Sequence, residues 1–194
     1  APGQIDLDLD DLGADFYSGN LHKWLCAPKG SAFLYAAPQV QSLVEPLVVS
    51  WGWESEHPSS SRLVDLLEWT GTRDPAAFLA VPDAIAFQHD HDWPAVRARC
   101  HQMAVETQRR IQELTGIPPL NGDDTSRFAQ MAASPLPDGL EIDTVKTRLY
   151  DQYKIEVPLV KWGEKNLIRY SYQAYNSRDD MEKLIAALTG ILRD

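Results

Sequence analysis

The spacing of apolar side chains changes along the chain, and each spacing predicts a different element. Between residues 177 and 192 apolar side chains recur every three or four positions, which is the period of a helix with one buried face. That stripe consists of Met181, Leu184, Ile185, Leu188 and Ile191. Ser177 and Asp180 have the spacing of a capping box, so we expect this helix to begin there.

The same period, read together with caps and helix breakers, predicts three further helices. They are expected over residues 75–88, 93–115 and 143–153. Gly116 ends the second of them. In the third, Val145, Leu149 and Tyr153 are expected to face inward. Residues 62–69 contain too few apolar side chains to decide between a helix and a strand.

Short apolar runs bounded by turn residues predict strands. These runs cover residues 16–21, 32–36, 127–133, 156–162 and 166–172. The first two are expected to belong to a larger sheet, and the last two to form a hairpin around Gly163. Residues 5–9 alternate between apolar side chains and aspartates, which predicts a short strand or extended segment. The expected fold class is α/β, and residues 116–194 form a small α+β domain after residues 1–115.

Composition narrows the class of protein. The 194 residues carry a formal net charge of −10, which argues against nucleic acid and anionic membranes as partners. No run of about 18 apolar residues predicts a membrane span, and the first residues lack the pattern of a secretory signal. The two cysteines form no disulfide framework, so we expect a cytoplasmic protein. The alternating aspartates lack the glycine and glutamate of a calcium loop, and we predict no metal site.

His22 and Lys23 are the strongest candidates for chemistry. They lie in the segment GADFYSGNLHKWLCAPKG, residues 13–30, and no acid occurs from residue 17 to residue 44 of this acidic chain. An isolated lysine can lose its proton and attack a carbonyl group, and a histidine beside it can donate to a phosphate. An isolated His-Lys pair is more often part of an ordinary surface, so spacing alone leaves both interpretations open.

Residues 13–30 resemble the lysine-bearing segment of class V aminotransferases, and in particular that of the isopenicillin N epimerase-like branch. The resemblance implies that Lys23 forms a Schiff base with the cofactor pyridoxal 5′-phosphate. It also implies that His22 and Asn20 bind this cofactor, and in a strand two residues so spaced share one face. The alternatives are a turn asparagine and a solvated histidine.

Two further elements match this family. Gly71 and Thr72 resemble its Gly-Thr element, which implies a homodimer with shared active sites, in which they contact the partner's cofactor phosphate. The alternative is a helix-capping turn. Residues 168–171, Ile-Arg-Tyr-Ser, resemble its Ile-Arg-x-Ser motif, which implies that Arg169 binds the α-carboxylate of an amino-acid substrate. The alternative is a structural ion pair with an acid such as Glu156.

The resemblance covers only the C-terminal half of the family's proteins. It implies a fold-type-I enzyme, with residues 1–115 as the end of the large cofactor-binding domain and its connecting helices, and residues 116–194 as the small domain. The implied activity is at the α-carbon or amino group of an amino acid, as an epimerase or racemase. Aminotransferase, carbon–sulfur lyase and cysteine desulfurase-like activities stay open, although no cysteine lies between residues 116 and 169 for persulfide chemistry. The last alternative is an inactive fragment or interaction domain that lacks the N-terminal half.

Overall fold

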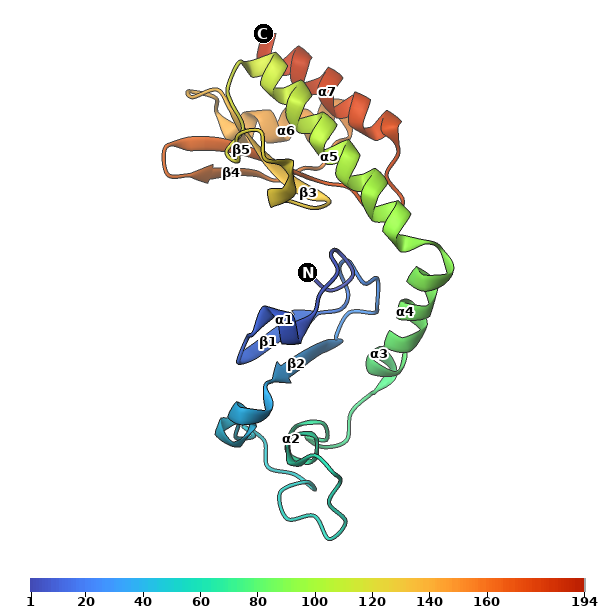
Figure 1. The fold of residues 1–194 in the computed structure, drawn as a ribbon. Coiled ribbons are helices and arrows are strands. Elements are labelled where there is room, and N and C mark those ends of the chain that lie inside the picture. The colour runs from blue at the N-terminus through green and yellow to red at the C-terminus, as the bar shows by residue number, and fades with distance from the viewer. Residues whose placement is uncertain (194) are drawn as a thin grey trace. The chain divides into compact units, whose positions relative to one another are not determined.

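The computed structural model describes residues 1–193, and the chain forms two compact units, residues 1–91 and 92–194 (Figure 1). The boundary expected after residue 115 differs from this division by one helix, α5 (Trp93–Thr115). This helix packs on a strand and a helix of the second unit. Among the described residues no helix has the length and apolar character needed to cross a membrane.

A three-stranded antiparallel sheet forms the centre of the second unit, with the strands in the order β3-β5-β4. These strands are β3 (Met131–Leu136), β4 (Leu159–Trp162) and β5 (Lys165–Ser171). Ala133 is opposite Arg169 in the β3–β5 pair, and Leu159 is opposite Ile168 in the β4–β5 pair. Helices α5, α6 (Ile142–Tyr153) and α7 (Arg178–Arg193) pack on this sheet and on one another (Figure 1).

The helix pattern predicted for the end of the chain is confirmed. All five residues of its apolar stripe are buried, and they share one core with Val145 and Leu149 of α6 and with Ile168 and Tyr170 of β5. The capping box is present, because the Ser177 amide donates to Asp180 Oδ2 at 2.9 Å. In return the Asp180 amide donates to Ser177 Oγ at 3.3 Å. The predicted hairpin of β4 and β5 also forms.

One predicted helix and one predicted strand have other bounds in the structure. The helix expected over residues 75–88 is broken into α3 (Ala76–Leu79) and α4 (Val81–Asp90), since Pro82 cannot donate an amide hydrogen bond and so begins a new helix. The strand expected over residues 127–133 lies at 131–136 instead. It continues through Pro135 because β3 is an edge strand, where a missing amide donor is tolerated.

Two smaller expectations hold only in part. Tyr153 is 39% exposed, and its hydroxyl lies against α7, where a Cβ at Gly190 would be 2.9 Å away. Residues 5–9 form no strand, although Asp8 has an extended backbone and Ile5 forms an isolated bridge with Pro2. The Asp8 carboxylate accepts hydrogen bonds from the amides of Asp10 and Asp11, and the short helix α1 (Leu9–Leu12) begins there.

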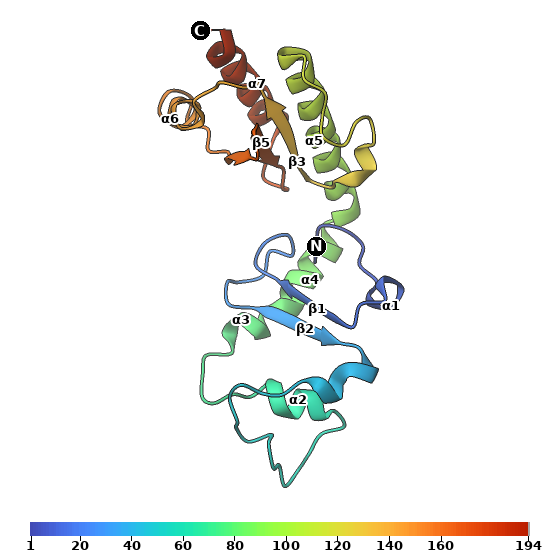
Figure 2. The same ribbon diagram turned by 90° about the vertical axis from the view of Figure 1, so that its left-hand side faces the viewer.

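The first unit contains the lysine-bearing segment. Strands β1 (Phe16–Asn20) and β2 (Ala32–Ala36) lie side by side (Figure 2). They pair antiparallel, with Phe16 opposite Ala36. Within the described residues they form a sheet of two strands, which is smaller than the sheet that we expected. A 3-10 helix, η1 (Pro38–Leu43), follows β2. The segment that the pattern left undecided is helical, as α2 (Arg62–Leu67).

Candidate active site

Lys23 lies in the loop between β1 and β2, three residues after β1 ends. Three backbone hydrogen bonds fold this loop. The Leu21 amide donates to the Ser31 carbonyl at 3.1 Å, which extends the β1–β2 ladder by one bond. The Ala27 amide donates to the Leu21 carbonyl at 3.0 Å, and the Cys26 amide donates to the Lys23 carbonyl at 3.2 Å. These bonds turn the chain so that Lys23 lies at an exposed bend.

Buried neighbours fix the loop backbone on either side of Lys23. An apolar cluster holds its base, and this cluster consists of Leu21, Leu25, Ala27, Phe33, Val81 and Ala84. Gln88 of α4 is 9% exposed, and its Nε2 donates to the Trp24 carbonyl at 2.8 Å. Gly3 also touches the loop, since a Cβ at that position would lie 2.6 Å from the Leu25 amide nitrogen. Only glycine fits there.

The side chains of the loop contrast with this fixed backbone. The Lys23 amine is exposed, and within residues 1–193 it makes no hydrogen bond or ion pair. Asn20 is the exposed last residue of β1 and is opposite Ala32, whereas His22 is half-buried in the bend that follows. Because β1 ends at Asn20, strand alternation alone does not place His22 on the same face.

Gly71 and Thr72 lie in the same unit, in the segment between α2 and α3. Gly71 has φ +127°, a backbone conformation that favours glycine, and the Thr72 side chain is exposed. The next residue, Arg73, holds this turn closed, because its guanidinium donates to the Glu68 carbonyl at 2.7 Å and lies 4.9 Å from the centre of the Phe78 ring. The turn therefore presents a threonine hydroxyl to solvent from a constrained backbone.

Arg169 lies in the middle of β5 in the second unit. Its neighbours Ile168 and Tyr170 point into the core and are 0% and 2% exposed, whereas Arg169 is exposed on the opposite face. Its amide donates to the Pro158 carbonyl at 2.9 Å. No carboxylate of the described residues pairs with its guanidinium, so the alternative of a structural ion pair with Glu156 is not what the structure contains.

The structure therefore brings together some of the predicted site residues. Asn20, His22 and Lys23 lie in one loop, and a hollow of the first unit joins the end of that loop to the turn after Thr72. The hollow is lined by Gly30, Phe33, Trp69, Arg73 and Phe78, among others. Arg169 lies in the other unit.

Sequence reasoning missed Gln88 and Gly3. Both act by holding the loop backbone, and neither belongs to a motif. A glutamine in a helical pattern is normally expected on the surface, so the sequence carries no signal that this one is buried against the Trp24 carbonyl. A glycine near the start of a chain is likewise expected in an ordinary turn.

A comparison with protein families shows which family the chain belongs to. The model of the family described as aminotransferase class-V matches residues 1–184 of the chain. The chain belongs to the class V aminotransferase family. This class V chain is 36% identical to the isopenicillin N epimerase of Amycolatopsis lactamdurans, over 97% of its own length and 50% of the relative's.

Other relatives have different names. The class V chain is 30% identical to the probable chloroplastic L-cysteine desulfhydrase of Arabidopsis thaliana, over 99% of its own length and 43% of the relative's. It spans about half the length of the curated relatives that it matches. The apo structure of a cysteine desulfurase from Thermococcus onnurineus NA1 is similar with a TM-score of 0.80 at 20% identity, over 100% of this chain and 50% of that chain. The expected fold class is confirmed by that likeness.

The surroundings of the two cysteines of the class V chain disfavour the thiolate form. Desolvation by the surrounding protein raises the pKa of the Cys26 thiol and of the Cys100 thiol above their ordinary value. Cys100 is also 0% exposed. Because the thiolate is the reactive form of cysteine, a raised pKa reduces the reactive fraction of both thiols.

Proposed function

We propose that this chain is the lysine-bearing part of a pyridoxal phosphate-dependent enzyme that acts at the α-carbon of an amino acid. The exposed, unpaired amine of Lys23 on a fixed backbone is the observation that carries the proposal. A lysine held this way reaches a bound aldehyde without first breaking an ion pair, and its position does not depend on a mobile loop.

The residues present fit this cofactor. The segment from residue 17 to residue 44 contains no acid that would repel a phosphate or pair with the amine. Asn20, His22 and Thr72 offer an amide, an imidazole and a hydroxyl, and within the described residues none of these side chains is engaged in a hydrogen bond or ion pair. We propose that Lys23 holds the cofactor covalently and that these three donate to it.

Bound pyridoxal phosphate supplies a carbonyl carbon that links to amines and a ring that takes up electrons from the substrate α-carbon. The chain's own residues then have two tasks. With the cofactor bound, the Lys23 amine would move the proton on one face of the α-carbon, and inversion would need a second proton donor on the opposite face. Arg169 binds the α-carboxylate through two parallel hydrogen bonds, since its guanidinium has no acid partner in the described chain.

Within this class we favour an epimerase or racemase, because relatives named isopenicillin N epimerase match at 36% and 32% identity. Aminotransfer and carbon–sulfur lysis remain alternatives, since relatives named L-cysteine desulfhydrase match at up to 30% identity. Incubation of the holoprotein with single amino acids separates the three activities. Loss of optical purity alone supports epimerisation, a keto acid without sulfide supports aminotransfer, and released sulfide supports lysis.

Borohydride reduction tests the position of the covalent link. The protein is loaded with pyridoxal phosphate, reduced and mapped by peptide mass spectrometry. We expect the reduced cofactor on Lys23, and we expect Lys23→Ala to lose both the mark and the visible absorbance. Lys29 is a matched control, because it is exposed in the same loop, six residues further along. A mark on Lys29, or one that survives Lys23→Ala, contradicts the proposal and favours the inactive or interaction-domain alternative.

We further propose that the enzyme is a homodimer in which Thr72 completes the cofactor site of the partner subunit. The exposed Thr72 hydroxyl on a constrained turn supports this. Mixed dimers of Lys23→Ala and Thr72→Ala test it. If the sites are shared, one of the two sites in each mixed dimer is intact, and a statistical mixture recovers about a quarter of the wild-type activity. If Thr72 serves its own chain, mixing restores no activity.

A further inference from the structure

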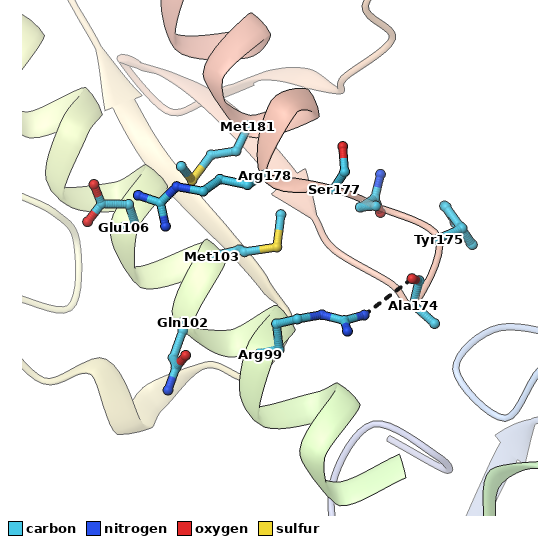
Figure 3. Close-up of a pocket in the computed structure, with 10 residues that line it drawn as sticks. Arg99, Gln102, Met103, Glu106, Ala174, Tyr175, Ser177, Arg178 and Met181 are labelled. Carbon is cyan, nitrogen blue, oxygen red and sulfur yellow. Dashed lines mark hydrogen bonds between the residues drawn. The ribbon is translucent and has the colours of Figure 1, made fainter. Parts of the chain in front are cut away.

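Arginines in both units hold backbone carbonyls with their guanidinium groups. In the second unit Arg99 of α5 donates to the Ala174 carbonyl at 3.3 Å, in the loop that leads into α7 (Figure 3). In the first unit Arg73 donates to the Glu68 carbonyl at 2.7 Å. In the described part of the chain neither guanidinium forms an ion pair with a carboxylate. Arg73 is the one that concerns the candidate site, because it directly follows Thr72.

The Arg73 side chain joins the two helices that border the turn of Gly71 and Thr72. Glu68 is the C-terminal cap of α2, and a helix leaves its last carbonyls without a donor of its own. The Arg73 guanidinium supplies this donor, and it also lies 4.9 Å from the centre of the Phe78 ring in α3. A cation–π contact adds to the charged hydrogen bond. One side chain therefore bridges the segment of residues 68–78.

Two further features fix the backbone beside Thr72. Gly71 has φ +127°, and a Cβ there would meet no atom beyond its chain neighbours within 4 Å, so conformation rather than space requires glycine. After the turn, the Asp74 carboxylate accepts a hydrogen bond from the Ala76 amide at 2.8 Å. The Thr72 hydroxyl is exposed between these two constraints, and no other described residue bonds to it.

An arginine next to a phosphate-binding group can have one of two roles. It can bind the phosphate itself, as guanidinium groups commonly do. Alternatively, it can fix the backbone from which its neighbour binds the phosphate. Its contacts with the Glu68 carbonyl and the Phe78 ring hold the Arg73 guanidinium between α2 and α3. A move toward a separate anion would break both contacts, so the geometry favours the second role.

We propose that Arg73 is a positioning residue. It fixes the turn so that the Thr72 hydroxyl donates to the phosphate of the cofactor, and it does not bind this phosphate itself. The inference rests on the proposed role of Thr72 in the cofactor site of the partner subunit. It adds that the affinity for the cofactor depends on a contact between α2 and α3, in which Phe78 takes part.

Cofactor titration of the full chain in its apo form tests the proposal. The probes are pyridoxal phosphate and pyridoxal, which lacks the phosphate, and the visible absorbance of the Schiff base reports binding. We expect Thr72→Ala and Arg73→Gln each to weaken the binding of pyridoxal phosphate about tenfold, because each loses one charged hydrogen bond to the phosphate. Both variants should bind pyridoxal as the wild type does, whereas a general folding defect would weaken both probes.

The double variant Thr72→Ala/Arg73→Gln shows how the two residues are related. If Arg73 acts only through Thr72, the double variant should bind pyridoxal phosphate no more weakly than Thr72→Ala alone. Arg73→Lys keeps the charge but loses the planar donors, so its affinity should lie between those of the wild type and Arg73→Gln. Phe78→Leu removes the ring and should weaken pyridoxal phosphate about two- to fivefold.

Arg62→Gln and Arg99→Gln are matched controls, because each removes a guanidinium that holds backbone carbonyls elsewhere. Arg62 lies in the same unit as Arg73 and donates to the carbonyls of Gly52 and Trp53 at 2.9 Å each. Arg99 makes the corresponding contact in the second unit. Both controls should leave the affinity for pyridoxal phosphate unchanged.

Hydrogen exchange reports the state of the turn without any cofactor. The Ala76 amide is bonded to the Asp74 carboxylate directly after Arg73, so its exchange should be faster in Arg73→Gln than in the wild type. In Thr72→Ala its exchange should be unchanged, since the exposed hydroxyl bonds to no other described residue. Equal exchange in Arg73→Gln and the wild type would contradict a clamping role for Arg73.

The titrations separate failure of this inference from failure of the proposed role of Thr72. Where Thr72→Ala weakens pyridoxal phosphate, unchanged affinity in Arg73→Gln overturns the inference alone. Equal weakening of pyridoxal by Arg73→Gln does the same, and so does a further loss in the double variant, which would mean that Arg73 binds the phosphate directly. If Thr72→Ala leaves the affinity for pyridoxal phosphate unchanged, the proposed role of Thr72 is wrong and this inference falls with it.

Discussion

The hydrogen bond from Gln88 to the Trp24 carbonyl should control how firmly the lysine loop is held. It joins residues 64 apart in the chain over 2.8 Å, and the donor is 9% exposed. The substitution Gln88→Leu keeps a side chain of similar size but leaves the carbonyl without its donor. An unsatisfied buried group costs about 1–3 kcal/mol. Since 1.4 kcal/mol is about a tenfold change in an equilibrium, local opening of the loop should increase about 5- to 150-fold.

Hydrogen exchange measures this opening directly. The amides of Cys26 and Ala27 are bonded inside the loop, so their exchange should accelerate by the same factor in Gln88→Leu. The Tyr172 amide, bonded to the Gln130 carbonyl in the second unit, should be unaffected. Gln39→Leu is the matched control, because Gln39 is exposed in the first unit. Unchanged exchange at Ala27 in folded Gln88→Leu would refute the view that α4 positions the loop around Lys23.

Three further predictions concern the second unit. Arg169→Lys should raise the KM for the amino-acid substrate about tenfold or more while the denaturation midpoint stays the same, because one charged hydrogen bond is lost at an exposed site. Leu188→Ala should lower the free energy of unfolding by about 2–5 kcal/mol in urea titrations, whereas Leu120→Ala, at a residue 44% exposed, should change it by less than about 0.5 kcal/mol. The hydrogen bond from the Ser177 amide lowers the pKa of Asp180, so its stabilising effect is present above the ordinary value of 3.8 and is lost as the pH falls below it. The difference in stability between the wild type and Asp180→Asn should therefore be present at neutral pH and disappear in acid.

The parts of the fold that the sequence predicted well are those with a local cause. The capping box at Ser177 and the left-handed glycine that ends α5 depend on residues a few positions apart. The strand β3 was misplaced because the local rule against proline in a strand has an exception at sheet edges. Whether Pro135 lies at an edge depends on the order β3-β5-β4, which no local pattern specifies.

The same distinction applies to the candidate site. The proposal that Lys23 is a reactive amine rests on its neighbours in sequence, because the family motif and the absence of nearby acids are both local. The position of Lys23 depends on the backbone of its loop, which Gln88 and Gly3 contact from other parts of the chain. Such contacts are made by residue types that are common in any helix or turn, so a motif search does not find them. A variant of Gln88 keeps every residue of the motif, but it should increase local opening of the loop. Its effect would therefore show that the residue types of a site and their positions have different causes in the sequence.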